Sequence, residues 1–199
     1  MTRDLEVNDH LASDGEIVAA SMREPERFAS IFERHFAAIH HYLARRVGED
    51  LADDLAAQVF LVAFERRGTF RAGTNDARPW LYGIATNLVR NNRRAERRLL
   101  AAMGRLNGGR DVLPETESAA SADDLAQLAR ALASLNRAQR DALLLHAWEG
   151  LSHSEIASSL GVPAGTVASR IARARRHLRQ VLGGTGSAPR QRQGQGGKT

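Results

Sequence analysis

The chain has 199 residues, 43% of them hydrophobic, and its 28 Lys+Arg outnumber its 23 Asp+Glu to give a formal net charge of +5. This composition allows one modest core or two small ones, and the absence of cysteine excludes disulfides and thiolate metal sites. No apolar run approaches the roughly 20 residues of a membrane span, and the N-terminus is acidic rather than typical of a signal peptide, so we expect a cytoplasmic protein without an intrinsic membrane segment.

The first 24 residues are predicted to be an acidic extension. Only Arg3 and Arg23 oppose seven acidic residues within residues 1–26, which are Asp4, Glu6, Asp9, Asp14, Glu16, Glu24 and Glu26. Such a segment is typical either of a regulatory extension or of disorder, and the sequence leaves both interpretations open.

Residues 25–103 are predicted to form a helical unit. Apolar residues recur at helical spacing in three segments: Phe28, Ile31, Phe32, Phe36, Ile39 and Leu43; then Leu51, Leu55, Val59 and Val62; then Leu81, Ile84 and Leu88. Three amphipathic helices can close a small core, so this unit is expected to be all-α.

An irregular loop, "RRGTFRAGTNDARPW" (66–80), is predicted between the second and third helices. The third helix continues as "LYGIATNLVRNNRRAERR" (81–98), and residues 90–105 hold six arginines against Glu96 alone. This kind of surface suits the separation of DNA strands, because unpaired bases stack on aromatic rings while arginines bind the backbone.

A change of composition marks the end of this unit. Residues 104–122 hold glycines, a proline and few large apolar residues, which is typical of an exposed flexible linker. Two further amphipathic helices are predicted at 124–134 and 136–148, the latter opened by an Asn136 cap. Residues 183–199 are predicted to be a disordered basic tail, which leaves 123–182 as a four-helix unit.

The stretch "GLSHSEIASSLGVPAGTVASRIARARRHLR" (150–179) predicts a helix-turn-helix. Ser152 and Glu155 form a capping box at the start of one helix, and Gly161 is suited to the left-handed conformation that ends it. The fixed φ of Pro163 suits the first turn of a second helix, and a second apolar stripe follows at spacings of three and four residues. Two helices joined through a glycine turn are typical of the motif whose second helix lies in the major groove.

The second helix of this motif is a candidate DNA-reading helix. Its arginines are uninterrupted by acids and lie on both sides of the apolar stripe, at Arg170, Arg173, Arg175, Arg176 and Arg179. A run of charge alone often marks only a solvated face, but here it follows a capped helix and a glycine turn. Thr166, Ala168 and Ser169 are short enough to let the backbone approach base edges, and Arg170 is the best candidate for a bidentate contact to guanine.

Taken in order, these segments resemble bacterial RNA polymerase sigma factors of the extracytoplasmic-function type, group IV of the sigma-70 family. The segment 50–70, "DLADDLAAQVFLVAFERRGTF", resembles their polymerase-binding region. The segment 77–94, "ARPWLYGIATNLVRNNRR", resembles the minus-10 recognition and melting region, and residues 135–179 resemble the domain that reads the minus-35 element. The resemblance covers about residues 25–182.

The resemblance implies an all-α protein with two domains, region 2 at 25–103 and region 4 at 123–182. The implied partners are core RNA polymerase, through the coiled coil of its largest subunit and its flap, and promoter DNA; an anti-sigma factor is a further candidate. We expect no cofactor, no metal and no enzymatic activity, because the sequence lacks a phosphate loop, a nucleophile-base signature and a metal cluster.

The resemblance also implies roles for individual residues. It implies that Asp53, Asp54, Leu55 and Phe60 bind core polymerase. Beside them, Ala57 and Gln58 depart from the Gln-Glu pair that is usual in the family. Loop residues 71–76 match the segment that captures a flipped base. The candidate minus-10 residues are Arg71, Asn75, Asp76, Trp80, Asn87, Arg90 and Asn91. The candidate minus-35 residues are Thr166, Ser169, Arg170, Arg173 and Arg176, with Ala168 at a position where a lysine is common.

Plainer interpretations remain for several of these residues. Trp80 is spaced to pack in the core, and Asn87 fits an ordinary exposed helix position. Asp53 and Asp54 could simply favour the first turns of their helix. His35, His40 and His41 lack the spacing of metal ligands. A stand-alone helix-turn-helix regulator of the response-regulator type is the alternative function, although it would account only for residues 123–182.

Overall fold

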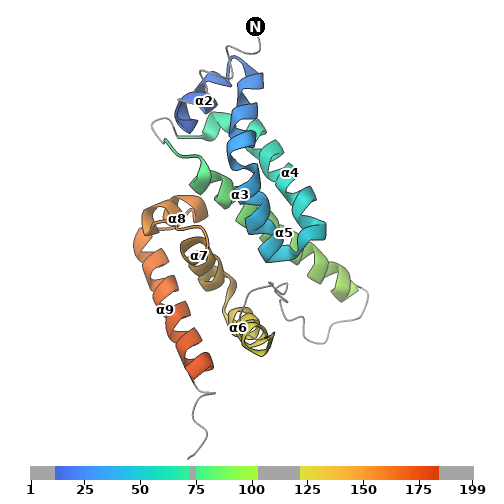
Figure 1. The fold of residues 1–199 in the computed structure, drawn as a ribbon, viewed down its shortest axis with the longest axis vertical. Coiled ribbons are helices and arrows are strands. Elements are labelled where there is room, and N and C mark those ends of the chain that lie inside the picture. The colour runs from blue at the N-terminus through green and yellow to red at the C-terminus, as the bar shows by residue number, and fades with distance from the viewer. Residues whose placement is uncertain (1–11, 72–74, 103–121, 184–199) are drawn as a thin grey trace, which may run out of the picture.

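The computed structural model describes residues 12–71, 75–102 and 122–183, and within these ranges the secondary structure is helical. Figure 1 shows two helical units, which confirms the predicted all-α fold. The first unit comprises α2 (Asp14–Ala20), η1 (Pro25–Phe28), α3 (Ala29–Val47), α4 (Glu49–Glu65), η2 (Arg67–Thr69) and α5 (Arg78–Ala102). The second comprises α6 (Ala122–Ser134), α7 (Arg137–Ala147), α8 (His153–Leu160) and α9 (Ala164–Gly183).

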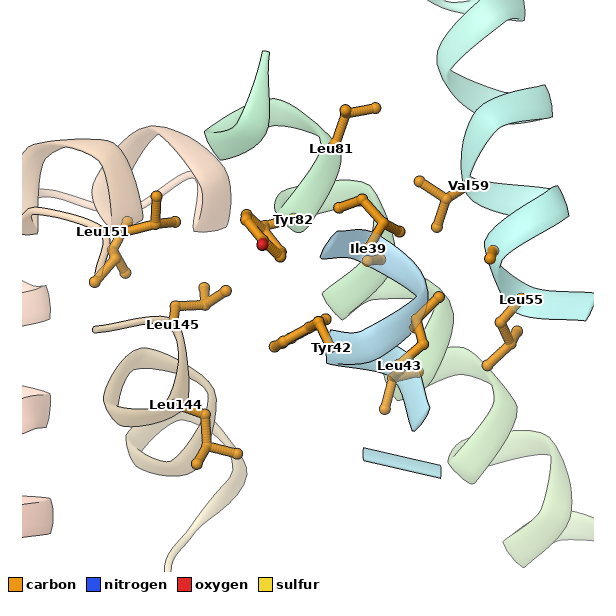
Figure 2. Packing of buried hydrophobic residues seen from close by; sticks show 14 of the residues in the cluster. Ile39, Tyr42, Leu43, Leu55, Val59, Leu81, Tyr82, Leu144, Leu145 and Leu151 are labelled. Carbon is orange, nitrogen blue, oxygen red and sulfur yellow. The ribbon is translucent and has the colours of Figure 1, made fainter. Parts of the chain in front are cut away.

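The three helices predicted in the first unit are confirmed as α3, α4 and α5. Gly48, with a φ of 90°, separates α3 from α4, a backbone conformation that favours glycine. Side chains from the three helices pack together, among them Ile39, Leu43, Val59 and Leu81 (Figure 2). The predicted loop ends sooner than expected, because Pro79 and Trp80 already lie in the first turn of α5. Proline is tolerated there because it has no N–H group, and the N–H groups of a first turn have no partner within the helix.

A fourth helix, α2, lies within the segment assigned to the acidic extension. Ser13 caps it, and the Ser13 N–H donates to Glu16 Oε2 at 2.7 Å to complete a capping box. Ile17 and Val18 are buried in the core of the first unit. The last part of the extension is therefore an integral helix of this unit, whereas residues 1–11 lie outside the described ranges.

The local signals predicted for the second unit are confirmed. The Gln139 N–H donates to Asn136 Oδ1 at 2.9 Å at the start of α7, and Ser152 and Glu155 form the capping box of α8. Gly161 ends α8 with a φ of 63°. The apolar stripe of α9 is buried at Val167, Ile171 and Ala174, so α8 and α9 form the predicted helix-turn-helix.

The two units pack against each other. Figure 2 shows Leu145 and Leu151 of the second unit facing Tyr42 and Tyr82 of the first, and all four are buried. The predicted flexible linker and basic tail fall outside the described residues, apart from Ala122 and Gly183 at the ends of helices. The packing nonetheless brings α8 against the early turns of α5 (Figure 1).

Candidate nucleic-acid interfaces

Helix α9 presents its arginines beside and opposite its buried stripe. Arg173 and Arg176 are exposed and Arg170 is half-buried, while Val167 and Ile171 are held in the core. The Ser169 hydroxyl donates to the Thr166 carbonyl oxygen at 2.9 Å. The five candidate minus-35 residues thus lie on one helix, which is held by the other helices of its unit and presents several cations to solvent.

A second polar surface lies along α5. Asn87 and Asn91 are exposed, one turn apart, and Arg90 lies between them. Arg90 NH1 lies 3.5 Å from Asn87 Oδ1, and Arg90 Nε donates to Asp141 Oδ2 at 2.7 Å. Three of the candidate minus-10 residues therefore form a continuous group, but the guanidinium of Arg90 is engaged by a carboxylate of the second unit.

Three of the remaining candidate minus-10 residues line a hollow at the start of α5. Its volume is about 430 Å³, and Trp80 lies half-buried in its wall with its ring centroid 5.1 Å from that of Phe70 in an edge-to-face arrangement. Arg71 and Asp76 also line it, and Ser154, Glu155 and Ser158 of α8 form the opposite side. The fourth, Asn75, is exposed and precedes Asp76 in the chain. The structure thus combines both interpretations of Trp80, since the ring packs on the core and also faces a cavity.

A buried polar cluster joins the two units, and sequence reasoning missed it. Asp141 on α7 is only 1% exposed, and its Oδ1 accepts from Arg46 NH2 at 2.5 Å while its Oδ2 accepts from Arg90. Arg46 also donates to the Tyr42 hydroxyl at 2.9 Å. Nearby, the Tyr82 hydroxyl donates to Glu149 Oε2 at 2.5 Å. Burial and this bond raise the pKa of Tyr82, so the phenol remains a donor.

The candidate polymerase-binding residues divide into two groups on α4. Asp53 and Asp54 are exposed, and Asp53 Oδ1 lies 2.9 Å from His40 Nε2. Leu55 and Phe60 are only 7% and 5% exposed and pack inside the first unit. The two aspartates are therefore accessible on the surface of α4, whereas the two apolar residues hold the helix in place.

Asp14 is a second residue that sequence reasoning did not single out. It is 6% exposed, and its carboxylate accepts from Arg34 at 2.9 Å, from His35 at 2.7 Å and from the Ala77 N–H at 2.8 Å. Although burial acts to raise the pKa of Asp14, these donors lower it to about 2. The Ser13-x-x-Glu16 capping box ahead of Ile17 and Val18 is the signal in the sequence that marks this helix.

Comparisons with known proteins identify both helical units. Residues 31–99 match Sigma-70 region 2, and residues 125–178 match Sigma-70, region 4. The ECF RNA polymerase sigma factor SigM of Mycobacterium tuberculosis (strain ATCC 25618 / H37Rv) is 34% identical over 178 residues, which cover 87% of either chain. The RNA polymerase sigma factor CarQ of Myxococcus xanthus is 33% identical over 163 residues, 79% of this chain and 90% of CarQ.

Solved structures share the fold. The sigma factor RpoE of Bartonella quintana, in complex with the anti-sigma factor NepR, superposes with a TM-score of 0.61 at 24% identity, over 78% of this chain and 96% of that one. CnrH, in complex with the cytosolic domain of CnrY, also gives a TM-score of 0.61 at 24% identity, over 86% and 97% of the two chains.

Region 2 followed by region 4 in one all-helical chain defines a sigma-70 type protein. The chain belongs to the extracytoplasmic-function group of RNA polymerase sigma factors. It directs RNA polymerase to promoters, and the response-regulator alternative is not favoured, because the region 2 match covers α4 and most of α3 and α5. In the ranges that the structure describes, each helix is too short or too polar to span a bilayer.

The ion-pair cluster of Asp14 predicts a distinct acid sensitivity. Since the pKa of Asp14 is lowered from 3.8 to about 2, its ionised form stabilises the fold above pH 3.8, and this contribution is lost as the pH falls toward 2. We expect Asp14→Asn to be less stable than the wild type at neutral pH, with the difference shrinking as the pH falls. Urea unfolding at a series of pH values measures this, and a difference that stays constant down to pH 2 would contradict it.

Proposed function

We propose a division of labour in which α9 reads the minus-35 duplex, α5 and the hollow before it bind the opened minus-10 strand, and α4 docks on core polymerase. One observation carries this proposal: two separate cationic surfaces, on α9 and α5, lie on different units of one chain whose units match sigma regions in order. Duplex reading needs a helix that fits the major groove, whereas strand capture needs stacking rings and a cavity.

The surface around α5 supports the second half of this division. Phe70 and Trp80 offer ring edges and faces for stacking, and Asn87 and Asn91 offer amides that can bind exposed base edges. Binding energy to flipped bases would offset an unpairing cost of a few kcal/mol per base. Arginines farther along α5, including Arg94 and Arg98, are exposed to bind the phosphate backbone.

We also propose that the protein acts in the cytoplasm, where the polymerase works, and by binding alone rather than as an enzyme. An anti-sigma factor is proposed as a further partner. This is supported by the fold shared with RpoE and CnrH, whose structures hold NepR and the cytosolic domain of CnrY.

Reversing the charge of Asp54 should weaken binding to core polymerase. Because Asp54 is exposed on α4, Asp54→Arg replaces attraction by repulsion without disturbing the core, and we expect affinity to fall by roughly tenfold, about 1.4 kcal/mol. Fluorescence titration of labelled protein with core polymerase measures the change. Glu65→Arg, at an exposed acid at the other end of α4, is the control; equal loss in both variants would refute a localised docking site.

Two arginines of α9 should separate base reading from phosphate binding. Arg170→Ala should lose about 1–3 kcal/mol at one base pair of the minus-35 element and relax specificity there. Arg176→Ala, nearer the end of α9, should weaken binding to all duplexes and reduce the salt slope by about one. Titration of duplexes with single base-pair changes at several salt concentrations checks both; altered minus-10 selectivity in Arg170→Ala would exclude the assignment.

A further inference from the structure

Asp14 connects three parts of the first unit through one carboxylate. Its Oδ1 accepts from Arg34 and its Oδ2 accepts from His35, both on α3. The same Oδ2 accepts from the Ala77 N–H, and the Asp14 N–H itself donates to the carbonyl oxygen of Asn75 at 3.3 Å. Asp14 therefore holds the chain just before α5 from two directions.

The hydrogen bond from the Ala77 N–H to Asp14 replaces a helix cap that neighbouring residues would ordinarily supply. The Ala77 N–H lies immediately before α5, where backbone donors lack partners within the helix. Asp76 accepts from the Arg78 N–H at 2.8 Å, but Ala77 depends on a carboxylate 63 residues earlier in the chain. The path of residues 75–77, and with it the rim of the hollow beside Trp80, is thus set by α2.

We propose that Asp14 is a positioning residue for minus-10 recognition, which makes α2 part of the strand-reading unit although it lies outside the region 2 match. The proposal rests on the proposed role of α5 and its hollow. Asp14 itself faces inward and is buried, so it acts through Asn75 and Ala77 rather than by touching DNA.

The test compares Asp14→Ala with Glu16→Ala, in holoenzyme reconstituted with core polymerase. Glu16 stabilises the same helix through the capping box but makes no bond to α5, so its loss controls for weakening of α2. Promoters with each base at the minus-10 positions are compared by permanganate footprinting of open complexes. We expect Asp14→Ala to reduce discrimination at one base by about tenfold, the size of one good base contact, with minus-35 affinity and core binding unchanged. Asp14→Asn, which keeps an oxygen acceptor for Ala77, should restore part of it.

Variants of α5 distinguish the role of α5 from that of Asp14. If Trp80→Ala and Asn87→Ala leave minus-10 selectivity unchanged, the proposed role of α5 fails. If those variants change selectivity but Asp14→Ala behaves like Glu16→Ala, the positioning role of Asp14 is overturned while the role of α5 stands.

Discussion

The buried carboxylate of Asp141 imposes the strictest condition on the way the two units meet. A charge that is almost fully removed from water is tolerated only when it is paired and hydrogen-bonded. Here the pairing comes from Arg46 and Arg90, both on the opposite unit. Leaving such a carboxylate without a partner costs about 3–5 kcal/mol, so the units either meet in this register or separate far enough to let water in.

This condition explains why the interface is polar at its centre and apolar around it. Tyr42, Tyr82, Leu145 and Leu151 exclude water from the cluster, which strengthens each hydrogen bond within it. The same groups can be hydrated after separation, because tyrosine, arginine and aspartate all have favourable interactions with water. An interface of this composition is suited to reversible association, in contrast to the permanent core beneath α3 and α4.

The sequence predicts those features that depend on neighbouring residues. The capping boxes, the glycine turn of the helix-turn-helix and the apolar stripes are all determined within one or two helical turns, and the structure confirms them. The resemblance placed the candidate DNA-binding residues in order, and the fold brings those of α5 onto one face. Trp80 could not be assigned from spacing alone, because core packing and exposure to a cavity use the same position on the helix.

Features that the sequence does not predict depend on distant pairs. Nothing around Asp14 indicates that it caps Ala77, and Asp141 directly follows Arg140 although its partners lie on α3 and α5. Phe60 illustrates the reverse case, since a residue matched to a binding region proves to be buried. A helical pattern identifies which face is apolar, but it does not identify which other helix covers that face.

The separation of Arg46 and Asp141 by 95 residues also bears on how the chain is made. Domains tend to fold in order as they leave the ribosome, so α3 and α5 are complete well before α7 emerges. During that interval the guanidinium of Arg46 has only Tyr42 and water as partners. The first unit therefore has to fold while Arg46 is hydrated and not yet paired with Asp141. The nascent protein thus passes through an open form before the two units first pack together.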